Sequence, residues 1–154
     1  MFDEVNFKKF FIIVAVLSAA VWYVTKHYDV QDALKYAQEH RDLGKEPKVE
    51  FYIGSLYYLR SDYPHAIEAL LPMLQAYPTC QYAPKALLRL GNSYQYSQKW
   101  DGAREAFNIY LQYFPKSPEV EAVKAKMEII KFKGDSTETT NNLGDIYGAI
   151  EMPE

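Results

Sequence analysis

The chain has 154 residues, which is enough for one domain with an appendage. Hydrophobic residues make up 49% and charged residues 24%, so the composition is that of a folded protein rather than a disordered one. The formal charge of −3 argues against a nucleic-acid binder, and a single cysteine excludes both an intramolecular disulfide and a multi-thiolate metal site.

The first predicted element is an uncharged apolar segment, Phe10 to Val24, with lysines on both sides. We predict that residues 1–27 contain an uncleaved single-pass membrane anchor. At ~1.5 Å per residue the apolar segment covers only about 22 Å of a ~30 Å hydrocarbon core, so the prediction needs flanking lysines and aromatic residues to extend it. A signal peptide cleaved after Ser18-Ala19-Ala20 is the alternative. A lipoprotein signal is excluded because it needs a cysteine just after the apolar segment and Cys80 lies far beyond it. A buried core helix fits poorly because the segment is apolar on all sides.

Residues 28–45 are predicted to form a linker and a cap helix. Their apolar residues recur at helical spacing and form one stripe, made of Val30, Ala33, Leu34 and Ala37. Such a stripe is suited to packing on the first unit of the repeat that follows.

Residues 46–133 contain an internal repeat at an offset of 37 residues. Identical residues occur at Gly54/Gly91, Tyr57/Tyr94, Ala66/Ala103, Glu68/Glu105, Ala69/Ala106, Leu74/Leu111, Gln75/Gln112 and Pro78/Pro115. Each unit is predicted to be a helical hairpin, in which the glycine and the first alanine allow two helices to pack closely. The proline then ends the second helix.

This spacing of glycine, tyrosine, alanine and proline resembles the tetratricopeptide repeat, a helix–turn–helix unit of about 34 residues. The sequence from Tyr77 to Tyr94 narrows the resemblance to the branch found in bacterial envelope proteins of the BamD and CpoB type. The expected fold is all-α, with a transmembrane helix followed by a short solenoid of two full repeats and flanking cap helices. Glu119 to Phe132 would be the last cap, because Glu128 and Lys131 replace the glycine and tyrosine of a third unit.

No constellation of catalytic or metal-binding residues is recognisable in the sequence. The three histidines are scattered, Cys80 has no activating neighbour, and no phosphate-binding or hydrolase motif occurs. We therefore predict no enzyme activity, no cofactor and no metal.

The predicted partner-binding surface is the groove lined by the first helix of each repeat, as the resemblance implies. Its candidate residues are Phe51, Tyr58, Lys85, Arg89, Asn92 and Tyr96. Lys85, Arg89 and Asn92 form a polar row that resembles part of the carboxylate clamp of chaperone-binding tetratricopeptide repeats. An ordinary solvated helix face is the alternative interpretation.

The last segment, residues 134–154, has five acidic residues and no basic one. Four apolar residues recur in it at one helical spacing, namely Leu143, Ile146, Tyr147 and Ile150. We predict that these four residues bind another subunit, and a frayed tail or an intramolecular cap is the alternative.

Together these features predict a membrane-anchored, non-catalytic adaptor, an accessory or structural subunit of a larger membrane protein complex. Its expected partners are other protein subunits and the lipid bilayer, the latter through residues of about 7–25, with no nucleic acid and no small-molecule substrate. The expected location is the bacterial inner membrane with the repeats in the periplasm, and a cytosol-facing or organellar membrane is the alternative. A chaperone-like or targeting receptor that transiently binds peptide termini is the alternative function.

Overall fold

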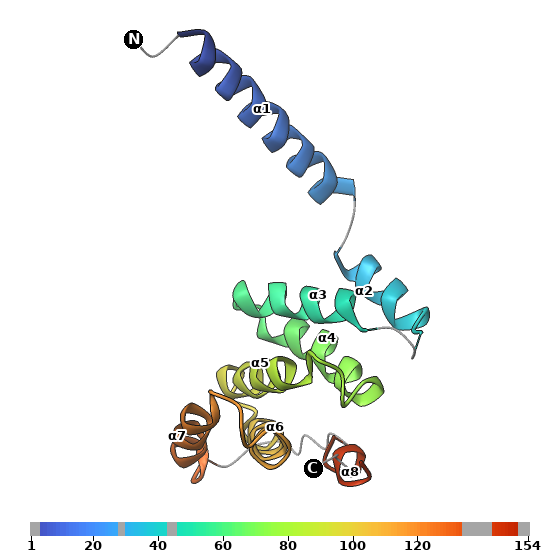
Figure 1. Cartoon of the computed structure of the whole chain (residues 1–154), viewed down its shortest axis with the longest axis vertical. Helices are drawn as coiled ribbons and strands as arrows, with labels where there is room; N and C mark the ends of the chain where they lie inside the picture. The colour runs from blue at the N-terminus through green and yellow to red at the C-terminus, as the bar shows by residue number, and fades with distance from the viewer. Residues whose placement is uncertain (1–3, 28–29, 43–45, 134–142, 151–154) are drawn as a thin grey trace.

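The computed structural model describes residues 4–27, 30–42, 46–133 and 143–150. These residues form eight α-helices and no strand (Figure 1). The helices are α1 (Glu4–His27), α2 (Val30–Glu39), α3 (Lys48–Leu59), α4 (Tyr63–Ala76), α5 (Ala83–Tyr96), α6 (Trp100–Tyr113), α7 (Val120–Ile130) and α8 (Leu143–Gly148). The all-α prediction is therefore confirmed.

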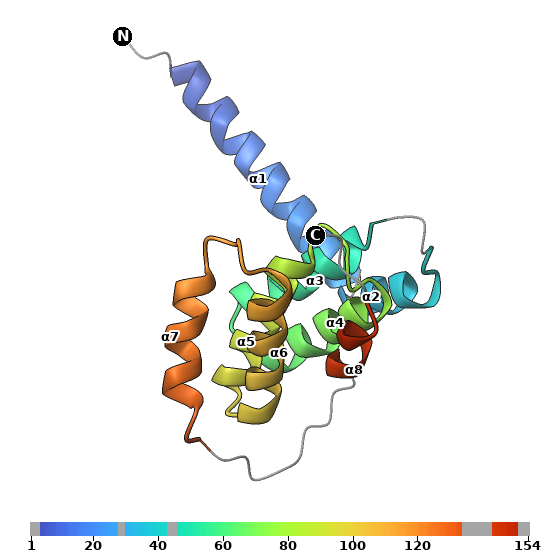
Figure 2. The ribbon, with the colours of Figure 1, turned by 60° about the horizontal axis from the view of Figure 1, so that its bottom comes forward.

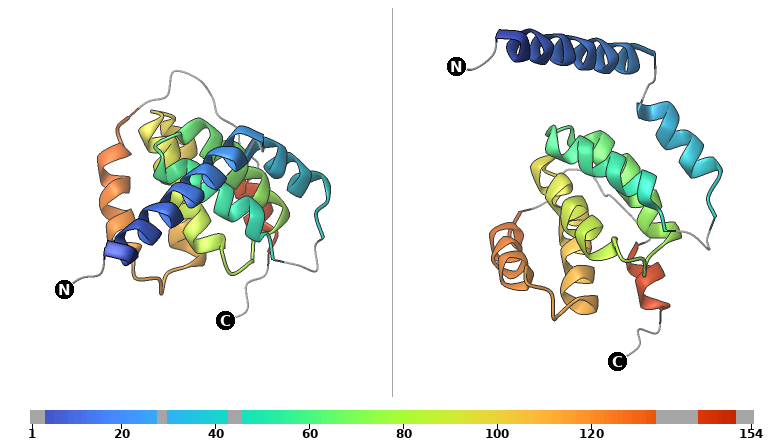
Figure 3. Two further views of the ribbon diagram at one scale, coloured as in Figure 1. Left: turned by 90° about the horizontal axis from the view of Figure 1, so that it is seen from above. Right: turned by 45° about the horizontal axis from the view of Figure 1, so that its top comes forward.

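The predicted transmembrane helix is wrong. Within the described part of the chain, no helix combines the length and the apolar character that crossing a membrane requires. Lysines on both sides limit the uncharged part of α1 to residues 10–25, about 24 Å of a ~30 Å core. In Figure 1 and in the right-hand view of Figure 3, α1 extends away from the other helices.

Two helical hairpins, α3–α4 and α5–α6, form the centre of the molecule (Figure 2). At each crossing the chain needs a glycine. A Cβ atom on Gly54 would lie 2.6 Å from Cγ of Leu70, and one on Gly91 would lie 2.4 Å from Cε1 of Phe107. Ala66 and Ala103, the small residues of the second helices, are fully buried. These residues allow the close approach that the repeat predicted.

The same turn joins the two helices of each hairpin. Ser61 and Gln98, which are 37 positions apart, adopt left-handed backbone conformations with φ of 60° and 58°. After each of them, a backbone N–H donates to a carbonyl near the end of the first helix, from Asp62 to Tyr57 and from Lys99 to Tyr94, both at 2.9 Å. This geometry satisfies carbonyls that the helix end leaves without a partner.

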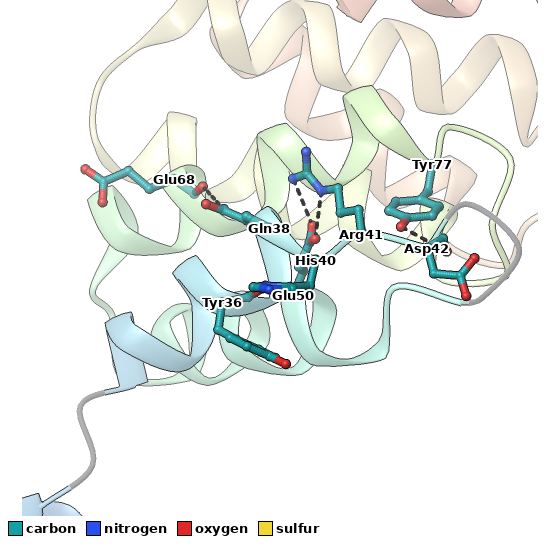
Figure 4. Close-up of polar contacts among 8 residues, drawn as sticks. All are labelled: Tyr36, Gln38, His40, Arg41, Asp42, Glu50, Glu68 and Tyr77. Carbon is teal, nitrogen blue, oxygen red and sulfur yellow. Dashed lines mark hydrogen bonds and ion pairs between the residues drawn. The ribbon is translucent and has the colours of Figure 1, made fainter.

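Helix α2 covers the first hairpin and contacts α3 and α4. Leu34 is the buried residue of its predicted stripe, whereas Ala33 is exposed. Behind α2, Arg41 forms a two-bonded ion pair with the buried Glu50 of α3, with Nε–Oε1 at 2.9 Å and Nη2–Oε2 at 3.2 Å (Figure 4). Because a buried carboxylate is costly without a partner, this pair ties the segment after α2 to the first repeat.

Helix α7 closes the other end by packing on α6. Val123 and Ile130 are fully buried, while the charged residues of α7 point outward, as expected for a cap. Nη1 of Arg104 on α6 donates to the carbonyls of Ile130 and Lys133, at 3.2 and 2.6 Å. These bonds satisfy carbonyls at the carboxyl end of α7.

Helix α8 folds back on its own chain and packs against α4 and α6. Leu143 and Tyr147 are fully buried. The Tyr147 hydroxyl donates to the Pro78 carbonyl at 2.7 Å, and the Gly144 N–H donates to Oε1 of Glu105 at 2.9 Å. Helix α8 is thus an intramolecular cap on α4 and α6, the second helices of the two repeats. Leu143 and Tyr147 are buried within the chain, whereas Ile146 and Ile150 stay partly exposed, and binding of these four residues to another subunit stays a prediction.

Candidate partner-binding groove

The first helices of the two repeats, α3 and α5, contact each other. Phe51 of α3 is only 5% exposed, and its ring stacks on Tyr82 with a centroid distance of 4.5 Å. Phe51 therefore belongs to the core, although we predicted it as a partner-binding residue. Phe51 lies on the first helix of its repeat, as predicted, but the adjacent repeat covers its side chain.

Arg89 reaches from α5 across to α3. Its Nη1 donates to Oγ of Ser55, and its guanidinium lies 5.1 Å from the centroid of the Phe51 ring, a cation–π contact. Ser55 in turn donates to the Phe51 carbonyl at 2.5 Å. Burial lowers the pKa of the Arg89 guanidinium from its ordinary value, and the nearby Tyr58 offsets only part of this effect.

Asn92 lies one turn further along α5 and is 8% exposed. Its Nδ2 donates to the hydroxyl of Tyr58 at 3.3 Å. Burial raises the pKa of Tyr58, and this hydrogen bond lowers it by a smaller amount. Within the described residues, neither Oδ1 of Asn92 nor Oε1 of Gln95 has a hydrogen-bond partner, although both atoms are buried.

Lys85 does not join Arg89 and Asn92. It lines a separate cavity of about 200 Å³ with Leu88, Tyr110 and Glu119, between α5 and the segment before α7. The row that resembled a carboxylate clamp is therefore divided, because Arg89 and Asn92 contact residues of α3 whereas Lys85 lines this cavity.

An exposed aromatic rim lies at the carboxyl ends of α3 and α5. Tyr96 is 55% exposed and stacks on Tyr63 at a centroid distance of 4.8 Å, and Leu59 is 72% exposed. The stack joins the two repeats, because Tyr63 begins α4 and Tyr96 ends α5. Tyr96 lies where a partner can contact it.

A family comparison agrees with this architecture. The tetratricopeptide repeat family model matches residues 85–117, which contain nearly all of α5 and the whole of α6. The match supports a tetratricopeptide repeat over residues 85–117, which are less than half of the chain. No curated protein and no solved structure matches the chain.

Charge is distributed unevenly over the repeats. Helix α5 carries Lys85 and Arg89 and no acidic residue, and the acidic residue of α3, Glu50, is already paired with Arg41. The acidic residues of the repeats lie instead on the second helices, at Glu68, Asp101 and Glu105. The first-helix face is therefore basic in a chain of negative net charge.

Helix α8, the described part of the tail, packs on the second-helix side, against α4 and α6. Leu143 and Tyr147 are fully buried there, and Ile146 and Ile150 are partly buried. While α8 is docked, Leu143 and Tyr147 are unavailable to a partner.

Two groups of sequence candidates carry no site chemistry in the described residues. No group of three or more histidine, cysteine, aspartate or glutamate side chains is placed to hold a metal ion there. Burial raises the pKa of the Cys80 thiol, and the nearby Glu46 adds to the rise. This shift disfavours the reactive thiolate.

The sequence places Ser55 and Gln95 on first-helix faces that point toward the groove, but we did not predict them as partner-binding residues. Ser55 contacts Arg89, and the carbonyl oxygen of Gln95 is one of three buried side-chain atoms without a partner among the described residues. Their repeat register was the available signal, since both occupy first-helix positions expected to face the groove. Register could not show which polar atoms the packing leaves unpaired.

Proposed function

We propose that this protein is a non-catalytic adaptor that holds a partner protein in the groove of its repeats, as an accessory subunit of a larger assembly. Tetratricopeptide repeats mediate protein–protein interaction, and their stacked helices form the surface that binds. The observation that carries the proposal is the α3–α5 face, where the exposed Tyr96 and Leu59 lie beside the polar residues Arg89 and Asn92. Aromatic residues and arginine are the residues enriched in protein interfaces.

Helix α1 supports the role of a subunit. Its large apolar side chains are exposed around the helix, at Phe7, Phe10, Phe11, Ile12, Ile13, Val14, Val16, Leu17, Trp22 and Tyr23. A helix that is apolar on all sides is stable when it is enclosed, and an exposed apolar surface of this size is typical of an interaction site. We propose that other subunits of the assembly enclose α1.

We also propose a location in the bacterial envelope, with the repeats in the periplasm. Its support is the resemblance of Tyr77 to Tyr94 to envelope proteins of the BamD and CpoB type. Fractionation of the native host, with the full chain detected in the periplasmic or the cytosolic fraction, tests this location.

Site-specific photo-crosslinking of the full chain in its native host tests the adaptor function. A photoreactive phenylalanine analogue at position 96 reports on the groove, and the same analogue at position 36 is the control, because Tyr36 is 64% exposed on α2. We expect one discrete protein adduct from position 96 and none of that mass from position 36. Equal patterns from both positions, or no protein adduct from position 96, would refute the proposal.

The receptor for peptide termini has less support. It needed Lys85, Arg89 and Asn92 to act together, and Lys85 lines a different cavity. Crosslinks from position 96 that change with growth conditions and never reach stoichiometric yield would favour the receptor over the permanent subunit.

A further inference from the structure

A stripe of apolar side chains lies on the solvent-facing side of α3, the first helix of the first repeat. Val49, Tyr52 and Leu56 recur at helical spacing and are 50%, 61% and 43% exposed. Helix α2, which covers this end of the repeats, contacts α3 and α4 and leaves the stripe open. A repeat that ends a solenoid needs a polar outer face to stay soluble. The apolar stripe therefore indicates an interface at this end of the molecule.

A cavity of about 450 Å³ lies beside the stripe, between α2 and the start of α3. Its apolar wall is made of Ala33, Tyr36 and Ala37 of α2 and Val49 of α3. Tyr36 is 64% exposed, and its ring is stacked on that of His40 at a centroid distance of 4.1 Å (Figure 4). The two alanines leave space between the helices that a large side chain can fill. We call the stripe and this cavity together the α2–α3 surface.

Helix α1 of the same chain has the apolar character that this surface requires. It extends away from the other helices (Figure 1), and its five aromatic side chains are 56–67% exposed. They are Phe7, Phe10, Phe11, Trp22 and Tyr23. One chain therefore exposes both an apolar helix and an apolar receiving surface, and its own fold keeps them apart. A second copy can bring the two together, since α1 of each copy can cover the surface of the other.

The charges of the two surfaces are complementary. Residues 5–27 contain three lysines, two before the apolar segment and one after it, and no acidic residue. The described lining of the cavity has the acidic residues Asp42, Glu46 and Glu50 and the basic residues Arg41 and Lys48. This lining is therefore negative overall. Because α1 is basic at both ends, a lysine can lie near the cavity in either direction of packing, and such charges steer two surfaces together.

The apolar area available is sufficient for a stable pair of chains. A fully covered aromatic side chain buries about 150–250 Å². With half of α1 covered in each of two reciprocal contacts, the aromatic side chains of α1 together with Tyr36 and Tyr52 bury roughly 800–1,400 Å². The aliphatic side chains of both surfaces add to this area. A specific interface needs about 1,000 Å², so a two-fold exchange of α1 supplies enough.

We infer that two copies of this chain exchange their α1 helices, so that α1 of each copy packs on the α2–α3 surface of the other and inserts an aromatic side chain into its cavity. This inference rests on the proposed enclosure of α1 by other subunits of the assembly, and it names a second copy of the chain as that subunit. Tyr96, at the end of α5, lies outside the α2–α3 surface and remains available to a different partner.

Photo-crosslinking of the full chain in its native host tests the exchange. A photoreactive phenylalanine analogue at position 36, on the wall of the cavity, is compared with the same analogue at position 129. Ile129 is the matched control because it is also 64% exposed and lies on α7, at the other end of the repeats. We expect position 36 to give an adduct of twice the chain mass, in which mass spectrometry joins residue 36 to residues 7–23. Position 129 should give no such adduct.

Substitutions separate docking from folding. With the analogue at position 36, Tyr52→Arg should reduce the yield of this adduct at least tenfold, because it places a charge against the apolar side of α1. Tyr52→Phe retains the ring and should leave the yield unchanged, as should Ile129→Arg on α7. Circular dichroism of the purified variants confirms that each is folded.

Three outcomes would overturn the inference. The first is a crosslink from position 36 to α1 within a single chain, which would show that each copy covers its own surface. The second is an adduct of position 36 with a different protein, or no protein adduct. The third is a yield that is equal at positions 36 and 129 or that Tyr52→Arg does not lower. A discrete adduct from position 96 together with any of these results would leave the adaptor function standing, whereas its loss would remove that function as well.

Discussion

Replacing Gly91 with alanine should destabilise the repeats, because the α5–α6 crossing has no space for a methyl group. An added Cβ would lie 2.4 Å from Cε1 and 2.6 Å from Cδ1 of Phe107. Phe107 is fully buried, so its ring cannot turn outward into solvent to relieve the clash. The backbones of α5 and α6 must separate instead, which loosens the core between them.

The expected magnitude follows from two opposing effects. Overpacking a filled core costs ~1–3 kcal/mol, whereas alanine in place of glycine inside a helix returns roughly 0.5–1 kcal/mol. The close contact with a buried ring places this site in the upper half of the range, so the net loss is about 2 kcal/mol. For a chain of 154 residues each kcal/mol lowers the melting temperature by roughly 2–4 °C, which gives a fall of about 4–8 °C.

Thermal unfolding followed by circular dichroism at 222 nm measures this effect. Gly148→Ala is the matched control, because a Cβ there meets nothing within 4 Å. Gly54→Ala should behave like Gly91→Ala, since its Cβ would lie 2.6 Å from Cγ of Leu70. If Gly91→Ala melts at or above the temperature of the unmodified protein, the packing of the hairpin described above is wrong.

Three further predictions concern the tail and the cysteine. Deleting residues 143–154 should lower the melting temperature, because the burial of Leu143 and Tyr147 is lost, and an unchanged value would show that α8 does not stabilise the repeats. Burial raises the pKa of Tyr147, so its contribution to stability is complete below the unfolded-state pKa of about 10 and is lost as the pH rises toward the higher folded value. Urea unfolding at pH 8 and pH 11 should therefore show a smaller alkaline loss in Tyr147→Phe, which itself costs about 1 kcal/mol at pH 8 through the bond to Pro78. Burial also raises the pKa of the Cys80 thiol, so iodoacetamide should alkylate Cys80 more slowly in the folded than in the unfolded chain at pH 8, and equal rates would contradict this.

The hairpins could be predicted because their signals are local and repeated. Gly54 and Gly91 are required wherever two helices approach closely, and Pro78 and Pro115 end helices by removing a backbone donor. These constraints act over a few residues. Because they recur at an offset of 37 residues, chance agreement is a poor explanation. The cap character of α7 could be predicted for the same reason, since Glu128 stands where a third unit would need glycine.

The candidate site could be predicted only as a set of positions. Register placed Phe51, Arg89 and Asn92 on first-helix faces, yet the adjacent repeat buries Phe51 and draws Arg89 toward Ser55. Which polar atoms remain unpaired depends on the distances between helices, and the periodicity of the sequence does not give these distances. Lys85 belongs to the same row as Arg89 and Asn92 in the sequence, but it lines a cavity that contains neither of them. Side chains of one helix point in different directions and therefore face different neighbours.

The sequence by itself determined the all-α class, the repeat register and the small residues at the helix crossings, because backbone sterics and periodicity act over short distances. Only the tertiary structure decided that α8 covers its own repeats. The bond from Tyr147 to Pro78 joins residues 69 positions apart, and such a contact exists only once both hairpins have packed. The apolar spacing of the last segment showed that it needs burial, and contacts with α4 and α6 bury Leu143 and Tyr147 within the same chain.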